Sequence, residues 1–165
     1  MKFLLSAYSK FIINYPVAIF ITIAVLTLAA LILQYVFGFL PCTLCKLQRI
    51  PYYFILVLGL FNFASKRRCE ATYVKMVILV LAVTAMLAFY HAGVEYGVFE
   101  NVFNCVAGAS NFNNIAELQG HLTNKISVPC DKPVFKFIFT LSGWNFFIAI
   151  TLGFFGIIHI LLRKR

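Results

Sequence analysis

Four long runs of apolar residues constrain this chain more than any other feature of its sequence. A hydrocarbon core about 30 Å thick needs roughly 20 residues of apolar helix to cross it. The runs cover residues 16–40, 47–64, 76–93 and 143–162. Lipid offers no hydrogen-bond partners, so each run must satisfy its own backbone groups as a helix. The sequence therefore predicts an all-α membrane protein built as a bundle of four transmembrane helices.

The composition agrees with lipid as the main surroundings of the chain. Of its 165 residues, 62% are hydrophobic and only 12% are charged, which is more apolar material than one small soluble core can bury. The formal net charge of +9 falls in short clusters between the apolar runs, as in the loops of a membrane protein. We therefore expect one membrane domain over residues 1–165 and no nucleic-acid partner.

The distribution of Lys and Arg predicts how the bundle is oriented, because cytoplasmic loops carry the excess of basic residues. The richer side carries Lys2, Lys10, Lys66, Arg67, Arg68, Lys75, Arg163, Lys164 and Arg165, and the poorer side carries Lys46, Arg49, Lys125, Lys132 and Lys136. Both termini are then cytoplasmic. The loops over residues 41–46 and 94–142 face the other side, which is the periplasm if the membrane is a bacterial inner membrane.

The long second outer loop shows one periodic stretch. Phe112, Ile115, Leu118 and Leu122 are spaced so that they share one face of a helix. This spacing predicts a short helix lying in the membrane interface. A solvated loop with chance periodicity is the alternative.

Four of the five cysteines fall in the expected outer loops. Cys42 and Cys45 lie in the first loop and Cys105 and Cys130 in the second, whereas Cys69 lies on the inner side. Disulfides persist in oxidising compartments and not in the cytosol. Both outer pairs are therefore candidates for disulfide chemistry, and Cys69 has no assigned role.

The first pair forms a C-x-x-C unit where the second helix is expected to begin. The positive end of a helix dipole and the nearby Lys46 and Arg49 favour a thiolate there. Arg49 follows Cys45 by four residues, which places both on one helical face. Its guanidinium is suited to stabilise a thiolate or a reduced quinone oxygen. An arginine that only anchors the helix end at the interface is the alternative.

Other interpretations of the cysteines stay open at this point. A zinc site would need four ligands drawn from two loops, and two purely structural bridges would also fit the spacing. The Cys105 and Cys130 pair either opens on reduction to reach another thiol or simply staples its loop. His91, near the outer end of the third helix, either donates a hydrogen bond to a quinone carbonyl or moves a proton, or has no role. Glu95 is interpreted as an interface charge.

Three stretches together resemble one known family. They are residues 41–49 (PCTLCKLQR), residues 90–97 (YHAGVEYG) and residues 128–133 (VPCDKP), the last leading to a Gly-Trp-Asn sequence at 143–145. With four helices and two outer cysteine pairs, this pattern is similar to that of the disulfide bond formation protein B (DsbB) family. The resemblance extends over nearly the whole chain.

The resemblance implies an activity and roles for six residues. A protein of this kind reoxidises a periplasmic thioredoxin-like oxidase (DsbA-like) and passes two electrons to ubiquinone or menaquinone in the inner membrane. Cys105 would form the mixed disulfide with the partner, and Cys130 would exchange with the first pair. Cys45 would meet the quinone, with Cys42 as its redox mate, and Arg49 and His91 would lie on the quinone side. No metal is implied.

Two rival functions remain. A protein resembling vitamin K epoxide reductase also has four helices and a C-x-x-C unit, but there the unit is expected late in the bundle. A small transporter or structural membrane protein with incidental disulfides belongs to a different class. Transport usually calls for ionisable groups at mid-membrane, whereas these runs offer weakly polar residues such as Thr22, Thr27, Thr84 and Thr151.

Overall fold

The computed structural model describes residues 14–100, 126–127 and 138–163. Within them lie four long helices and two short strands. In chain order these are α2 (Tyr15–Tyr35), β1 (Phe39–Leu40), α3 (Thr43–Ala64), α4 (Glu70–Glu95), β2 (Ile126–Ser127) and α6 (Leu141–Arg163). Each helix is long and apolar enough to cross a membrane. The prediction of a four-helix membrane bundle is confirmed.

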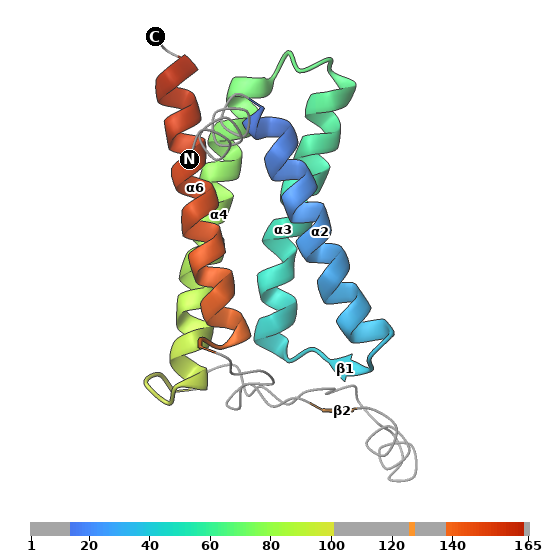
Figure 1. Cartoon of the computed structure of the whole chain (residues 1–165), viewed down its shortest axis with the longest axis vertical. Coiled ribbons are helices and arrows are strands. Elements are labelled where there is room, and N and C mark those ends of the chain that lie inside the picture. Colours follow the sequence, from blue (N-terminus) through green and yellow to red (C-terminus); the bar gives the residue numbers. More distant parts are fainter. Residues whose placement is uncertain (1–13, 101–125, 128–137, 164–165) are drawn as a thin grey trace, which may run out of the picture.

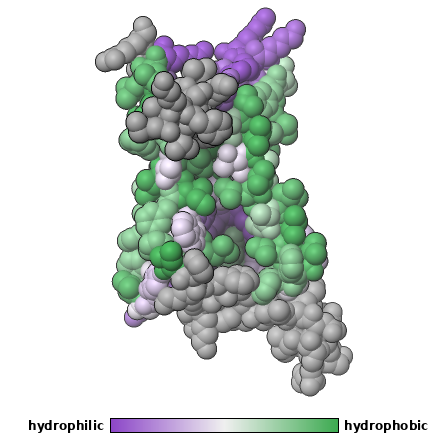
Figure 2. Space-filling view, in the orientation of Figure 1, coloured by the Kyte–Doolittle hydropathy of each residue, from purple (hydrophilic) through white to green (hydrophobic). Residues whose placement is uncertain are grey.

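The helices run alternately up and down the bundle (Figure 1). One end, here called the link end, contains the link between α3 and α4 together with the start of α2 and the end of α6. The opposite end, here called the cysteine end, contains β1 and the start of α3. The most extensive packing is between α4 and α6, followed by α3 against α4 and α2 against α3. Hydrophobic residues cover most of the visible side of the bundle, and hydrophilic residues gather at the link end (Figure 2).

Two helix ends at the cysteine end differ from the limits of the apolar runs. α2 ends at Tyr35 rather than at residue 40, and Gly38 with φ of +73° turns the chain into β1. Such a backbone conformation is easy only for glycine. α3 begins at Thr43 rather than at residue 47, because the Cys42 sulfur accepts a hydrogen bond from the Cys45 amide and caps the helix. Backbone turns and caps, rather than hydropathy, fix these boundaries.

The remaining helices also start before their apolar runs. α4 begins at Glu70 and ends at Glu95, against an expected 76–93. α6 begins at Leu141, and the Thr140 hydroxyl accepts a hydrogen bond from the Gly143 amide at 3.1 Å. A side-chain oxygen that accepts from the first turn is a usual way to start a helix.

The core of the bundle is apolar and closely packed near the link end. Its fully buried side chains include Tyr15, Ile19, Ile23, Ile55, Val74, Val77 and Leu81. The Tyr15 hydroxyl donates to the Leu152 carbonyl at 3.0 Å and so ties α2 to α6. Gly156 makes this approach possible, since a Cβ there would lie 2.8 Å from the Tyr15 oxygen.

An ionic cluster lies at the link end. The Glu70 carboxylate pairs with Arg67 at 2.9 Å and with Arg163, at the end of α6, at 2.7 Å. His159 Nε2 lies 3.8 Å from the same carboxylate. One acidic side chain therefore connects the start of α4 to the end of α6.

The two strands bring distant parts of the chain together at the cysteine end. β1 and β2 are parallel, with Phe39 opposite Ile126 and Leu40 opposite Ser127. β1 is followed two residues later by Cys42, and β2 is followed three residues later in the sequence by Cys130. Cys105, Cys130 and the interfacial helix expected over residues 112–122 lie outside the described residues.

Candidate active site

The site is built around Cys42 and Cys45 at the N-terminus of α3. Cys42 has an extended backbone, and its Sγ accepts the hydrogen bond from the Cys45 amide at 3.1 Å. Both cysteines are free thiols, and their sulfurs lie 2.7 Å apart. A disulfide has sulfurs about 2.05 Å apart. The helix start therefore holds the two sulfurs close enough to form a disulfide when an oxidant accepts two electrons and the two thiol protons are lost.

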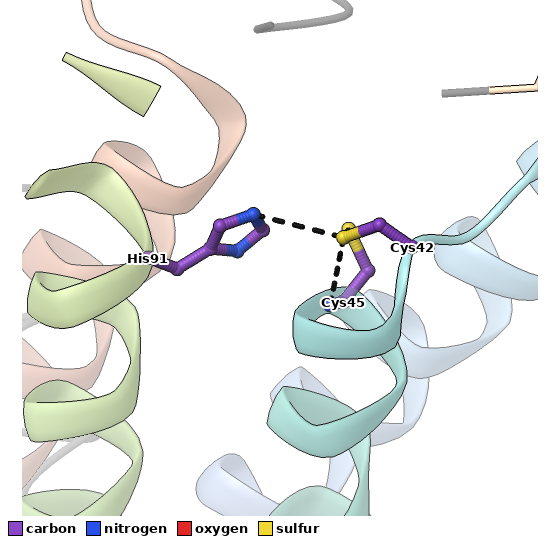
Figure 3. A group of neighbouring side chains, drawn as sticks. All are labelled: Cys42, Cys45 and His91. Carbon is purple, nitrogen blue, oxygen red and sulfur yellow. Dashed lines mark hydrogen bonds between the residues drawn. The ribbon is translucent and has the colours of Figure 1, made fainter. Parts of the chain in front are cut away.

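His91 reaches the cysteine pair from α4 (Figure 3). Its ring is only 3% exposed, and Nε2 lies 3.7 Å from the Cys42 sulfur. The ligand atoms of Cys42, Cys45 and His91 all lie within 4.8 Å of one another. Tetrahedral zinc, with Zn–S bonds of about 2.3 Å, would separate two thiolates by roughly 3.7 Å. The much shorter distance between these sulfurs favours a redox pair over a zinc site.

Cys42 is the cysteine whose surroundings favour the thiolate. The hydrogen bond with the Cys45 side chain is the largest influence and lowers the pKa of Cys42 to about 5. Burial opposes this change, while His91 and the Cys45 amide add to it. The thiolate is the nucleophilic form of cysteine, so Cys42 is prepared for thiol exchange at neutral pH.

A cavity of about 270 Å³ opens beside the cysteines, between α2, α3, α4 and α6. Its walls are mainly apolar, with Leu26 and Leu33 from α2 and Trp144 and Ile148 from α6. Figure 2 shows an opening in the lower part of the hydrophobic surface with hydrophilic residues inside it. A cavity with apolar walls and a few polar groups is the usual form of a site for a small molecule.

Arg49 brings a permanent positive charge to this cavity. Its Nη1 donates to the Gln34 Oε1 at 2.5 Å, and its Nη2 lies 3.4 Å from the Ala30 carbonyl, both on α2. Of the six residues proposed from the sequence, four line this one cavity, namely Cys42, Cys45, Arg49 and His91. The other two, Cys105 and Cys130, are not among the described residues.

Sequence reasoning missed a chain of polar residues behind His91. Gln48 Nε2 lies 3.0 Å from His91 Nδ1, and the Asn145 amide nitrogen donates to Gln48 Oε1 at 3.1 Å. The Tyr52 hydroxyl in turn donates to Asn145 Oδ1. Gln48 and Tyr52 follow Cys45 by three and seven residues, so their helical spacing was a usable signal. The part played by Asn145 on α6 depends on how the helices pack.

Glu95, interpreted from the sequence as an interface charge, also lies close to the cysteine pair. Its side chain is only 7% exposed, and one oxygen lies 3.9 Å from His91 Nε2. The Ser142 hydroxyl donates to its other oxygen. Glu95 follows His91 by four residues on α4, which is the spacing that places two side chains on one helical face.

Thr27 differs from three other threonines of the membrane helices. Thr22, Thr84 and Thr151 each donate to the carbonyl four residues earlier, at 2.8 to 2.9 Å. The buried Thr27 hydroxyl lines the cavity and has no hydrogen-bond partner among the described residues. Buried polar groups are rarely left unpaired. Thr27 is therefore a candidate contact for a molecule held in the cavity.

A four-helix membrane bundle with a thiol pair beside an apolar cavity defines a membrane thiol oxidoreductase. Residues 14–159 match the model of the family described as "Disulfide bond formation protein DsbB". The chain therefore belongs to the DsbB family and is a multi-pass membrane oxidoreductase of disulfide formation. This membership favours the oxidoreductase over the transporter and the vitamin K epoxide reductase alternatives.

A protein similar to this chain is itself uncharacterized. The chain is 25% identical over 138 residues to an uncharacterized protein, RP370, of Rickettsia prowazekii (strain Madrid E). The match covers 81% of this chain and 80% of that protein. No solved structure matches the chain.

Proposed function

We propose that this protein reoxidises a periplasmic thioredoxin-like (DsbA-like) dithiol oxidase and passes the electrons to a quinone of the bacterial inner membrane. One observation carries the proposal: the Cys42 and Cys45 thiols, Arg49 and His91 line the same cavity in an otherwise apolar bundle. Exposed thiol exchange and lipid-soluble electron acceptors can meet at such a place, because it lies where a membrane helix begins.

The residues around the cavity fit the head group of a quinone. The volume of about 270 Å³ lies just below the range of about 300–1,000 Å³ found for small-molecule pockets. Such a volume suits a ring better than a whole isoprenoid tail. Arg49, His91 and the Thr27 hydroxyl, which has no partner among the described residues, supply polar contacts between apolar walls. When bound, ubiquinone or menaquinone supplies an acceptor for two electrons and two protons.

The proposed cycle passes one disulfide along two cysteine pairs. The partner's dithiol attacks the disulfide between Cys105 and Cys130, forming a mixed disulfide at Cys105, and leaves oxidised. Cys130 of the reduced second pair then attacks the disulfide between Cys42 and Cys45. This exchange restores the disulfide between Cys105 and Cys130 and leaves Cys42 and Cys45 reduced. No electrons leave the protein in these exchanges. They leave when the reduced Cys42 and Cys45 close their disulfide again and release two electrons and two protons.

Two residues are assigned to the electron-accepting step. Arg49 stabilises negative charge beside Cys45 because its guanidinium stays protonated. His91 Nε2 lies 3.7 Å from the Cys42 sulfur and 3.9 Å from the Glu95 carboxylate. The ring can therefore hold or pass a proton beside the cysteine pair. Cys45 is the residue assigned to contact the acceptor, with Cys42 as the thiolate that forms the disulfide with it.

The pairing of β1 with β2 supports an exchange between the two cysteine pairs. A chain of three residues spans at most about 10 Å, and β2 is followed by Cys130 after three residues. β1 is likewise followed closely by Cys42. Two segments joined by backbone hydrogen bonds thus lead into one cysteine of each pair.

The test is loss of quinone absorbance when the purified protein in detergent is given a reduced thioredoxin-like partner. We expect turnover with the wild type and none with Cys45→Ser. Cys105→Ser should block the protein partner but spare slow quinone reduction by small thiols. Full partner turnover in Cys105→Ser would refute this division of labour, and no turnover with either quinone would refute the proposed function.

A further inference from the structure

The contacts of Gln48 determine which nitrogen of His91 carries the proton. The Gln48 side-chain nitrogen lies 3.0 Å from His91 Nδ1 and 3.4 Å from the Leu87 carbonyl oxygen. A carbonyl oxygen can only accept a hydrogen bond, so the amide NH₂ of Gln48 must face both groups. His91 Nδ1 then accepts, and in the neutral ring the proton is on Nε2.

Asn145 and Tyr52 hold Gln48 in this orientation. The Asn145 amide nitrogen donates to Gln48 Oε1, which leaves only the NH₂ group of Gln48 for His91. The Tyr52 hydroxyl donates to Asn145 Oδ1 and fixes that amide in the same way. In this row of hydrogen bonds, the Tyr52, Asn145 and Gln48 donors therefore all point toward His91. Aligned hydrogen bonds of this kind polarise one another in a low-dielectric interior.

The row of hydrogen-bonded side chains ends at the redox pair, because His91 Nε2 lies 3.7 Å from the Cys42 sulfur. We propose that Gln48 is a positioning residue of the redox centre, which fixes His91 in its Nε2–H tautomer so that the ring donates to the Cys42 sulfur. Asn145 and Tyr52 hold Gln48 for this purpose. The inference rests on the proposed function only for its consequence in turnover; the tautomer itself can be tested without a quinone.

The other charged and titratable groups facing Cys42 are compatible with this tautomer. They are Cys45, Arg49 and Tyr52 on α3 and His91 and Glu95 on α4. α2 and α6 contribute only amide, hydroxyl and apolar side chains to the described cavity wall. Glu95 lies 3.9 Å from the same His91 Nε2, and a carboxylate there also favours a proton on that nitrogen.

The role of the ring follows from thiol-exchange chemistry. When Cys42 attacks a disulfide or leaves as a thiolate, negative charge develops on its sulfur. A donor held at Nε2 stabilises that charge in both directions of the exchange. The opposite tautomer would present a lone pair to the sulfur and would favour the thiol instead. Gln48 thus acts on Cys42 through His91 without touching the sulfur itself.

The direct test is the ¹⁵N spectrum of histidine-labelled protein in detergent at pH 8, with Cys42 and Cys45 oxidised. We expect the His91 Nδ1 signal in the unprotonated range, with the His91→Gln variant identifying the signal. In Gln48→Met, which keeps the side-chain length and removes the donor, the population of the Nδ1–H tautomer should rise. A protonated Nδ1 in the wild type, or no change in Gln48→Met, would overturn the proposal.

The second test is the pH profile of the rate at which iodoacetamide alkylates reduced Cys42, followed by mass spectrometry. Losing the donor should raise the pKa of Cys42, and a pKa higher by one lowers the thiolate population about tenfold at pH values below the wild-type midpoint. We expect Gln48→Met to react about tenfold more slowly there and Tyr52→Phe to change in the same direction by less. Tyr52→Phe removes a single oxygen, so it remains informative if Gln48→Met does not fold.

Gln34 provides the matched control, because it is a glutamine of the same cavity that contacts Arg49 rather than His91. Gln34→Met should leave both the His91 tautomer and the alkylation rate unchanged. Equal slowing in Gln34→Met and Gln48→Met would show a general packing effect and reject the specific role. Neither readout uses a quinone, so failure of the proposed electron acceptor would leave both results standing on their own.

Discussion

The two ends of the bundle use polar groups in different ways. At the link end, Glu70 pairs with Arg67 and Arg163, and Tyr15 donates to the Leu152 carbonyl. These contacts pair protein groups with one another and join α2 and α4 to α6. Gly156 lets α2 and α6 approach at the same level. Polar chemistry at this end holds the bundle together.

At the cysteine end, the polar contacts are directed toward reactive atoms. The chain through Gln48 ends at His91 and the Cys42 sulfur, and the Thr27 hydroxyl faces the cavity without a partner among the described residues. Preorganised groups of this kind stabilise charge that develops during a reaction, rather than the folded state. The comparison teaches that mutations at the cysteine end should change chemistry, and mutations at the link end should change stability.

The largest expected effect comes from comparing one cysteine at each end. Cys45→Ser should reduce quinone reduction to background, because the disulfide of the first pair can no longer form. Cys69→Ser, on the exposed link between α3 and α4, should keep the wild-type rate. Both rates are measured by quinone absorbance with the same reduced partner. Comparable losses in the two variants would remove the distinction between the ends.

The next effect compares two arginines. Arg49→Ala should lower the efficiency of quinone reduction about 10- to 100-fold, because a hydrogen bond to a charged group contributes roughly 1.5–3 kcal/mol. Alkylation of Cys42 should be much less affected. Arg163→Ala, which removes the link-end contact with Glu70, is the control and should keep its turnover. Unchanged quinone affinity and rate in Arg49→Ala would return Arg49 to a role as a helix anchor.

A stability difference should appear at the link end. In Gly156→Ala the new Cβ would lie 2.8 Å from the Tyr15 oxygen and 2.9 Å from an Ile78 carbon. Overpacking of this kind costs about 1–3 kcal/mol in the free energy of unfolding. Gly153→Ala on the same helix meets nothing within 4 Å and serves as the control.

Unfolding in a dodecyl sulfate titration would measure both glycine variants. We expect a lower midpoint for Gly156→Ala only, with quinone reduction per folded molecule retained. A loss of turnover at full stability would contradict the division between the two ends.

The smallest effect concerns two threonines of α2. Thr27→Val should raise the quinone concentration for half-maximal rate about 2- to 10-fold, since one neutral hydrogen bond contributes about 0.5–1.5 kcal/mol. The Thr22 hydroxyl is already bonded to the Ala18 carbonyl, so Thr22→Val should have no such effect. Equal half-maximal concentrations in Thr27→Val and the wild type would show that Thr27 does not contact the acceptor.

The sequence predicted the bundle because long apolar runs leave lipid-spanning helices as almost the only choice. It placed the ends of the helices less well. Hydropathy reports which side chains tolerate lipid, whereas Gly38 and the sulfur cap at Cys42 decide where the backbone turns. Local hydrogen bonds of this kind leave only a weak trace in a hydropathy pattern.

The candidate site was predictable only where its residues have distinctive chemistry. Cys42, Cys45, Arg49 and His91 were found from their types and spacing, and the structure places them around one cavity. Glu95 was noticed, but its contact with Ser142 depends on how α4 packs against α6.

The polar chain behind His91 was missed for the same reason. Gln48 and Asn145 are ordinary residues until the packing of α3, α4 and α6 aligns them. Both lie in stretches that carry the family resemblance, but their side chains have no redox chemistry that would single them out. Their role becomes visible only when the three helices are assembled.

The short pairing of β1 with β2 has a kinetic consequence. Residues tethered near each other react at an effective concentration set by the connecting chain, commonly in the millimolar range for short linkers. The segment leading to Cys130 is held beside the segment leading to Cys42, so transfer between the two pairs should be first order in this protein. Dilution would then slow the encounter with the soluble partner and leave the internal step unchanged.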